Sequence, residues 1–196
     1  MKIVIATANK HKVEEVRRIL SPHGIEVLSL FDINQNLDDV DENGKSYAEN
    51  ALIKAKELSK KTNLPLISDD SGLEITALSG KPGVFTARFA EEKGGHLKAM
   101  NYILSKIEGK DRSARFVCSI AFIDENKHEH IFTGICAGQI SHEIHGNSGF
   151  GYDPFFIPEG CDQTFAELGE ELKNRISHRG LALFALVDYL KVEKLI

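Results

Sequence analysis

Residues 1–20 read MKIVIATANKHKVEEVRRIL, and this stretch decides the fold class. Residues 2–6 form an apolar run with the length of a buried strand. The segment from His11 onward repeats apolar side chains at helical spacing, namely Val13, Val16, Ile19 and Leu20. Gly24 then predicts the end of that helix, and IEVLSL (25–30) predicts a second strand. A strand–helix–strand beginning is typical of α/β proteins.

The following segments continue this alternation. Residues 31–44 predict an acidic loop, and Ser46 with Glu49 forms an S-x-x-E capping box that opens a helix of sequence ENALIKAKELSKK. PLIS (65–68) predicts a third strand, and a further helix is expected around residues 92–107.

The middle of the chain has a different pattern. Two long apolar-rich runs, at residues 112–124 and 128–140, predict an antiparallel hairpin. The chain closes with a predicted helix whose apolar face includes Leu181, Phe184, Leu186, Val187 and Leu190. These patterns predict an α/β fold with an elongated central mixed β-sheet and flanking helices. Because no linker divides the chain, we expect residues 1–196 to form a single domain, with two lobes around a substrate cleft.

Composition excludes several classes of protein. Of the 196 residues, 42% are hydrophobic and 27% are charged, and the net charge is −5. This balance excludes intrinsic disorder, and an acidic chain without a Lys/Arg-rich block predicts no binding to nucleic acid. The apolar runs are far shorter than the ~20 residues of a membrane span, and no secretory signal or CxxC motif is visible. We therefore expect a cytoplasmic location without membrane binding.

The turn after the first predicted strand is a candidate phosphate site. A strand that ends where a helix begins exposes unpaired N–H groups and the positive end of the helix dipole. Polar and cationic side chains there can add hydrogen bonds and charge. The candidate residues are Thr7, Ala8, Asn9, Lys10, His11 and Lys12. The alternative is an ordinary helix capped by Asn9 with solvated lysines.

Asp69 and Asp70 are adjacent at the end of a predicted buried strand, in the segment SDDSG. Adjacent carboxylates repel each other, so a bound cation would relieve them. Carboxylate oxygens suit Mg²⁺, and a remaining carboxylate can take a proton from an attacking water. Glu42, in the acidic loop, is a further candidate metal ligand. The alternatives are an Asx-turn that ends the strand and a solvated acidic loop.

The segment SGFGYDP (148–154) is a candidate site for a flat ligand. Its glycines allow close approach of the backbone, Phe150 can stack on a base, and Asp153 can accept from ring N–H groups. Basic residues near the last helix can contact a purine edge or a phosphate, and these are Lys173, His178 and Arg179. The alternatives are a tight loop with core aromatic residues and surface charges at helix ends.

Two other residue types give little sign of function. His128 and His130 flank the predicted hairpin turn, with no third ligand nearby to complete a transition-metal site. Cys118, Cys136 and Cys161 are interpreted as small core residues on strands.

Six segments together resemble one known family. They are TANKHK, Glu42 followed by YAENALIKA, SDDSGL, LSGKPGVFTARF, FGYDPFF and KNRISHRGLAL, and in this order they cover nearly the whole chain. The pattern is similar to the inosine triphosphate pyrophosphatase family, in its bacterial and archaeal branch. Members of that family remove non-standard purine nucleotides. The tyrosine of FGYD is a tryptophan in some of them.

The resemblance implies an activity and a set of residue roles. Family members use Mg²⁺ to hydrolyse ITP, dITP and XTP to the monophosphate and pyrophosphate, by attack of water on the α-phosphorus, and they are homodimers. The resemblance implies that Glu42 and Asp70 are metal ligands, and that Asp70 is also the catalytic base. It implies that the substrate contacts Thr7, Ala8, Asn9, Lys10, His11, Lys12, Ser71, Phe150, Gly151, Tyr152, Asp153, Lys173, His178 and Arg179. Lys54 and Arg88 fall in matching segments with less defined roles.

Three other functions are open alternatives. Maf-like pyrophosphatases also begin with a strand followed by a Ser/Thr-x-Asn loop, although SHRG and FGYD argue against them. A nucleotide sensor would bind without hydrolysis and would have no need of a metal-and-base set. A phosphatase with an aspartate nucleophile in DDSG would release phosphate, but the D-x-D spacing that such enzymes have after an apolar strand is absent there, because the two carboxylates are adjacent.

Overall fold

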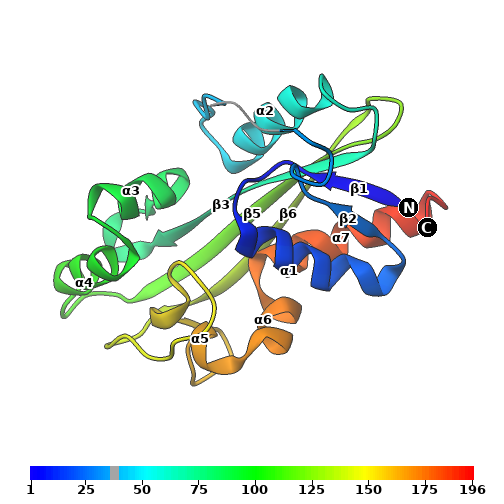
Figure 1. Ribbon diagram of the computed structural model, residues 1–196. Coiled ribbons are helices and arrows are strands. Elements are labelled where there is room, and N and C mark those ends of the chain that lie inside the picture. The colour runs from blue at the N-terminus through cyan, green and yellow to red at the C-terminus, as the bar shows by residue number, and fades with distance from the viewer. Residues whose placement is uncertain (36–39) are drawn as a thin grey trace. The chain divides into compact units, whose positions relative to one another are not determined.

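The computed structural model describes residues 1–35 and 40–196, so part of the expected acidic loop lies outside the described residues (Figure 1). The strands are β1 (Lys2–Ile5), β2 (Glu26–Leu28), β3 (Leu66–Ile75), β4 (Lys81–Pro82), β5 (Ser113–Ile123), β6 (Glu129–Ile140) and β7 (Phe156–Pro158). The α-helices are α1 (Lys10–Leu20), α2 (Tyr47–Ser59), α3 (Thr86–Glu92), α4 (His96–Lys106), α5 (Phe165–Leu168), α6 (Glu170–Ile176) and α7 (His178–Val192). Short 3₁₀ helices lie at Ser21–His23, Thr76–Leu78, Gly83–Phe85 and Asp153–Phe155. Within the described ranges, no helix is long and apolar enough to span a bilayer.

The strands pair in the order β2-β1-β3-β5-β6-β7, and β4 pairs with β3. β1 runs parallel to both of its neighbours, with Val4 opposite Leu28 of β2 and Leu66 of β3. β4 is antiparallel to β3, and β7 is antiparallel to β6. The predicted α/β fold with a mixed sheet and flanking helices is therefore confirmed.

The chain divides into two compact units, each made of separate segments. Unit 1 consists of Met1–Asp70, Cys118–Gly134 and Arg179–Ile196, and unit 2 consists of Ser71–Val117 and Ile135–His178. β3, β5 and β6 each begin in one unit and end in the other. The single domain expected from the sequence stays a prediction.

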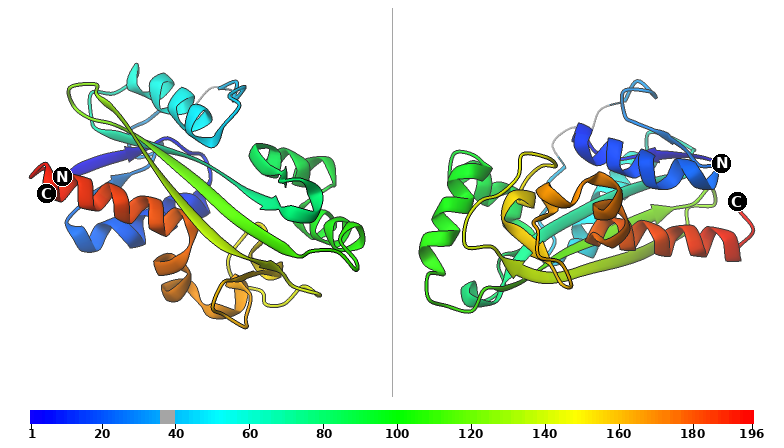
Figure 2. Two further views of the ribbon diagram at one scale, coloured as in Figure 1. Left: turned by 180° about the vertical axis from the view of Figure 1, so that it is seen from behind. Right: turned by 90° about the horizontal axis from the view of Figure 1, so that it is seen from below.

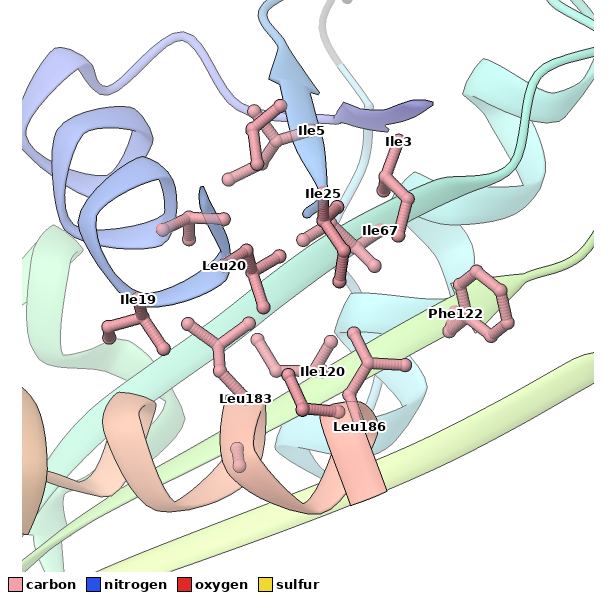
Figure 3. Close-up of a cluster of buried hydrophobic side chains, with 14 of the residues drawn as sticks. Ile3, Ile5, Ile19, Leu20, Ile25, Ile67, Ile120, Phe122, Leu183 and Leu186 are labelled. Atoms are coloured by element: carbon pink, nitrogen blue, oxygen red, sulfur yellow. The ribbon is translucent and has the colours of Figure 1, made fainter. Parts of the chain in front are cut away.

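Unit 1 is built in three layers. Side chains alternate along a strand, so Ile3 and Ile5 pack with α1 and α7, whereas Val4 and Ala6 pack with α2. Figure 1 shows α2 on the opposite side of the strands from α1 and α7. Figure 3 shows the first of these two buried clusters, where leucine side chains of α1 and α7 converge on those of the strands. This packing fixes the carboxyl ends of β1 and the first half of β3, where the predicted phosphate and metal residues lie.

Unit 2 has an aromatic core. The ring of Phe116 packs edge-on against that of Phe156, with centroids 4.7 Å apart, and Phe156 stacks on Phe165 at 5.3 Å. α3 and α4 lie side by side in this unit (Figure 2). The helix expected around residues 92–107 is α4, and α3 before it is a helix that the sequence analysis did not predict. The two helices are separated by Gly94 and Gly95, whose φ angles of 78° and 113° end α3.

Three further expectations need correction. β3 does not end at the acidic pair but continues through it to Ile75, so the alternative of an Asx-turn there is wrong. Leu181, expected on the apolar face of the last helix, is 40% exposed. Cys118 and Cys136 are buried on strands as predicted, and burial raises the pKa of each thiol to about 12. Cys161 instead is half-buried and lies outside the strands.

Candidate active site

The turn between β1 and α1 is a capped helix start. The Asn9 side chain accepts hydrogen bonds from the backbone N–H groups of His11 and Lys12, at 3.0 and 3.3 Å. The Thr7 hydroxyl accepts from the backbone N–H of Asn9 at 3.2 Å. Residues 8–11 are exposed. The alternative of an Asn-capped helix is therefore confirmed, and it leaves the polar N-terminal turn of α1 open to an anion.

Lys12 is not a solvated lysine. Its side chain is 18% exposed, and its Nζ lies 3.0 Å from Oδ2 of Asp69. The same Oδ2 accepts hydrogen bonds from Nε and Nη2 of Arg179, at 3.2 and 2.9 Å. The alternative of solvated lysines is therefore wrong for Lys12, because a buried carboxylate holds its ammonium group.

Arg179 lies at the centre of a buried series of ion pairs. Besides Asp69 it contacts Glu15, whose Oε2 accepts from Nη1 at 2.6 Å, and Arg179 is only 2% exposed. Glu15, Arg179, Asp69 and Lys12 thus alternate in sign. Sequence analysis missed Glu15. The available signal is that this acidic residue lies four positions before Ile19, on the apolar face of a helix.

Asp69 and Asp70 are neighbours in sequence with opposite electrostatic environments. Burial by itself raises the pKa of Asp69, but the charges of Lys12 and Arg179 outweigh it and hold that pKa well below its ordinary value. Burial also raises the pKa of Asp70, and there the charge of Lys54 offsets it only in part. Asp69 is therefore a fixed anion, whereas Asp70 is the more basic carboxylate.

The contacts of Asp70 explain this difference. Its Oδ2 accepts a hydrogen bond from Nδ2 of Asn50 at 3.0 Å, and its Oδ1 lies 4.0 Å from Nζ of Lys54. The same Nζ lies 3.0 Å from Oε2 of Glu42. One ammonium group therefore lies within reach of both predicted metal ligands. We call Lys12, Lys54 and Arg179, together with the acidic residues Glu15, Glu42, Asp69 and Asp70, the charge cluster.

These carboxylates fit the Mg²⁺ that the family resemblance implies. The Lys54 ammonium is a stand-in cation, which shows that the position between Glu42 and Asp70 favours positive charge. In the described part of the chain, no group of three or more His, Cys, Asp or Glu residues could hold a metal. Two carboxylates suffice for Mg²⁺, which usually completes its shell with waters and substrate phosphates. Oδ1 of Asp69 is also buried and accepts no hydrogen bond from the described residues.

In unit 2, residues 149–153 form a compact turn closed by the Asp153 carboxylate. Oδ2 of Asp153 accepts from the backbone N–H of Phe150 at 2.8 Å and from Nζ of Lys173 at 2.6 Å. That Nζ lies 4.6 Å from the centroid of the Phe150 ring. Gly149 has a φ of 77°, and a Cβ there would overlap the Asp153 carboxylate, so glycine is required. We call these residues with Lys173 the glycine turn. The alternative of a surface charge is wrong for Lys173, which is buried.

Tyr152 and His178 belong to the core of unit 2. Burial raises the pKa of Tyr152 to about 12, and its hydroxyl donates to the Thr86 carbonyl oxygen at 3.4 Å. The His178 ring stacks on that of Phe116, with centroids 4.6 Å apart and an interplanar angle of 13°. Sequence analysis did not select His96, whose ring packs edge-on against Tyr152 at 5.2 Å. The alternative of core aromatics is confirmed for Tyr152, and its contact with a substrate stays a prediction.

The remaining predicted residues are placed as follows. Ser71 follows Asp70 on β3 and is half-buried, and Gly151 lies in the glycine turn. Arg88 is exposed on α3, with its guanidinium carbon 5.8 Å from the centroid of the Phe85 ring. Unit 1 thus brings the β1–α1 turn, Lys54 and the acidic pair into one cluster, and unit 2 brings the glycine turn and Lys173 together.

The hairpin histidines have structural partners. Nδ1 of His128 lies 3.0 Å from Oδ2 of Asp124, and the His130 ring packs on that of Tyr189 at 4.6 Å. That His128 and His130 bind no metal stays a prediction.

Comparison with known proteins identifies the chain's relatives. It is 44% identical over 195 residues to the dITP/XTP pyrophosphatase of Flavobacterium johnsoniae, covering 99% of this chain and all of that protein. It is 41% identical over 192 residues to the protein of the same name from Oceanobacillus iheyensis, covering 96% of this chain and 98% of that one.

Solved structures of similar proteins have the same fold as this chain. The Staphylococcus aureus Ham1 protein superimposes with a TM-score of 0.86 at 36% identity, covering 98% of this chain and 100% of that chain. A HAM1 protein from Coxiella burnetii gives a TM-score of 0.84 at 38% identity, covering 97% and 98%. The Ham1 family model matches residues 3–189, which confirms the family resemblance seen in the motifs. With nearly the whole chain matched in sequence and in fold, this protein belongs to the Ham1 family.

Proposed function

We propose that this chain is a nucleoside-triphosphate pyrophosphatase. It hydrolyses the non-standard purine nucleotides ITP, dITP and XTP to the monophosphate and pyrophosphate, and so removes these triphosphates from the nucleotide pool. The proposal rests on the pyrophosphatase activity for which the relatives are named, and on one structural observation. Two adjacent carboxylates have different partners: Lys12 and Arg179 hold Asp69, whereas Asp70 accepts from Asn50 and lies 4.0 Å from Lys54, and their pKa values shift in opposite directions. Such a divergence is typical of sites that separate a structural anion from a catalytic base.

Asp70 is the catalytic base in this mechanism. It takes a proton from the water that attacks the α-phosphorus, as the family resemblance implies, and unlike Asp69 it is not held by two close cations. Asp69 is a poor base, because Lys12 and Arg179 stabilise its ionised form. Its part is to hold Lys12, at 3.0 Å, in a fixed position.

Lys12 and the N-terminal turn of α1 bind the polyphosphate. Lys12 neutralises charge that develops on the pyrophosphate leaving group, and Thr7, Asn9 and the exposed residues around them contribute hydrogen bonds. This turn lies beside the acidic pair, because Asp69 contacts Lys12 directly.

The charge cluster requires an added cation. Its three basic and four acidic side chains sum to 3 − 4 = −1, which does not favour a polyphosphate anion. Mg²⁺, when bound, supplies positive charge that neutralises the phosphate chain and favours ionisation of the attacking water. Glu42 and Asp70 would hold it, and Lys54 would then be released to a phosphate oxygen.

The glycine turn binds the base. The Phe150 ring stacks on the purine, and Asp153, Lys173 and His178 distinguish its polar edge. Arg179, which the resemblance implies as a further substrate contact, holds Asp69 and Glu15 in unit 1. Hypoxanthine and xanthine carry a 6-keto group, whereas adenine carries an amino donor there. A buried donor that binds the keto oxygen has no acceptor when adenine occupies the site. This unpaired donor disfavours ATP.

Oligomeric state and location complete the proposal. We propose a homodimer in the cytoplasm that binds neither nucleic acid nor membrane, as the resemblance and the acidic composition imply. Size-exclusion chromatography with light scattering tests the dimer directly, since a monomeric mass at micromolar concentration would contradict it.

A product assay tests the proposed function. Purified protein with Mg²⁺ is incubated in parallel with ITP, XTP, GTP and ATP, and the products are separated by ion-exchange chromatography. We expect IMP and pyrophosphate from ITP, with ATP nearly untouched. Formation of IDP and phosphate would instead indicate a phosphatase, and tight binding without turnover would indicate a sensor.

A further inference from the structure

Asn50 is a buried side chain that the proposed mechanism does not yet use. It lies in the first turns of α2 and is 3% exposed. Its backbone N–H donates to the Ser46 carbonyl oxygen within the helix, so its side-chain amide is available for contacts elsewhere.

Both ends of that amide are engaged. Oδ1 accepts a hydrogen bond from the backbone N–H of Gly44 at 2.8 Å, and Nδ2 donates to Oδ2 of Asp70 at 3.0 Å. A backbone N–H can only donate and an ionised carboxylate can only accept, and the amide satisfies both because it carries an acceptor oxygen and a donor nitrogen. Asn50 therefore ties the loop that carries Glu42 to the strand that carries Asp70.

Gly44 supplies separate evidence that this contact is close. A Cβ on residue 44 would lie 2.7 Å from Oδ1 of Asn50 and 2.8 Å from Cβ of Glu49. Any side chain at this position would push the loop away from α2. Glu42 lies only two residues before Gly44, so such a shift would move its carboxylate.

The contact also sets the orientation of Asp70. Because Asn50 occupies Oδ2, Oδ1 is the oxygen that lies on the side of Lys54, at 4.0 Å from its Nζ. The Glu42 carboxylate reaches the same Nζ from the loop, at 3.0 Å. The amide thereby fixes the relative placement of the two carboxylates that border one cation position.

We propose that Asn50 is a positioning residue, which joins the Glu42 loop to Asp70 so that both carboxylates bind one divalent cation. This inference rests on the proposed function for the identity of the cation site. It assigns to Asn50 no contact with the nucleotide.

Binding of Mn²⁺ to the nucleotide-free protein, measured by titration with detection of free Mn²⁺ by electron paramagnetic resonance, tests this role. We expect Asn50→Ala to weaken binding about 10- to 100-fold, the usual effect of losing a group that orients a metal ligand. In turnover assays kcat should fall while KM for ITP changes little, since Lys12 and the glycine turn are untouched.

A matched control comes from the same pair of elements. The Ser68 hydroxyl on β3 is buried and donates to the Ala51 carbonyl oxygen on α2, but it contacts neither carboxylate. Ser68→Ala should therefore lower the thermal midpoint while leaving Mn²⁺ binding unchanged. If Asn50→Ala does not fold, Gly44→Ala provides the second variant, because it displaces the loop and leaves the amide in place.

Three results would overturn the inference. One is wild-type affinity for Mn²⁺ in the folded Asn50→Ala or Gly44→Ala protein, and another is an equal loss of affinity in Ser68→Ala. The third is a wild-type protein that binds no Mn²⁺ without nucleotide, because Glu42 and Asp70 would then not form a cation site by themselves. The product assay with ITP reports on the proposed pyrophosphatase activity independently of all three.

Discussion

The charge cluster of unit 1 and the glycine turn of unit 2 are both built on a buried aspartate, but they use it differently. In the charge cluster, Asp69 accepts from both Lys12 and Arg179, and Arg179 continues to Glu15. In the glycine turn, Asp153 pairs with Lys173 and also accepts a hydrogen bond from the backbone N–H of Phe150, which closes the turn.

The difference matches the two parts of a nucleotide. Alternating charges hold Lys12 and Arg179 in place, and a bound Mg²⁺ would bring the net charge of the cluster from −1 to +1, which suits a polyphosphate. The Asp153–Lys173 ion pair beneath the Phe150 ring fixes shape more than charge, which suits a nearly neutral purine. Phosphate chemistry in unit 1 and base selection in unit 2 should therefore respond to different substitutions.

The largest expected effect follows from replacing the catalytic base. Asp70→Asn should lower kcat for ITP by about 10²- to 10⁴-fold, because the attacking water loses its proton acceptor. Circular dichroism should show an unchanged fold. Near-normal turnover in a folded variant would show that Asp70 is not the catalytic base.

Lys12→Ala should lower kcat/KM by a similar factor for ITP, XTP and the poor substrate ATP, on the order of 10- to 100-fold. The reason is that all three share the triphosphate, which Lys12 contacts in the proposed mechanism. Parallel steady-state kinetics with each nucleotide provide the measurement. A change confined to the ITP/ATP ratio would contradict the phosphate role.

His178→Ala should have the complementary effect in unit 2. We expect the ratio of kcat/KM for ITP to that for ATP to fall by about tenfold, the value of one lost discriminating contact. His128→Ala is the matched control, since that histidine is exposed at the hairpin turn and pairs with Asp124. An unaltered ratio in His178→Ala would count against base recognition by this residue.

The smallest effect concerns stability and pH. The pKa of Asp69 in the folded protein is held below its ordinary value of 3.8, so its ion pairs stabilise the fold above that pH and are lost as pH falls below it. Asp69→Asn should therefore be less stable than the wild type at pH 7. Urea titrations should show the gap in free energy of unfolding narrowing between about pH 5 and pH 3. A constant gap would mean that Asp69 is not the acid-sensitive group.

Much of the fold follows from the sequence. Period-3.6 and strand-like apolar runs predict β1, α1 and the long hairpin, because burial of one face dictates those patterns. The extension of β3 through the acidic pair could not be predicted in this way. Two adjacent aspartates are typical of turns, and here the cations Lys12, Lys54 and Arg179 stabilise them inside a strand, together with a hydrogen bond from Asn50.

The candidate site is partly predictable for a similar reason. The motif residues are contiguous in sequence and are recognised as such. Glu15 and Asn50 lie within helices, where a local pattern does not distinguish them from other helix residues. Their partners, Arg179 and Asp70, lie 164 and 20 positions away in the sequence. A pairing at such separation is a property of the tertiary structure, which a local pattern does not contain.

The interleaving of the two units limits how the chain can be divided. The chain passes between them four times, after Asp70, Val117, Gly134 and His178. No cut at one peptide bond yields two complete units. Neither unit can therefore be expressed alone as one uninterrupted piece of chain, or exchanged by a single recombination event. Two of these crossings fall at Asp70–Ser71 and His178–Arg179, within predicted site motifs. An insertion or deletion at either place would alter both units at once, so gene rearrangement is expected to avoid these points.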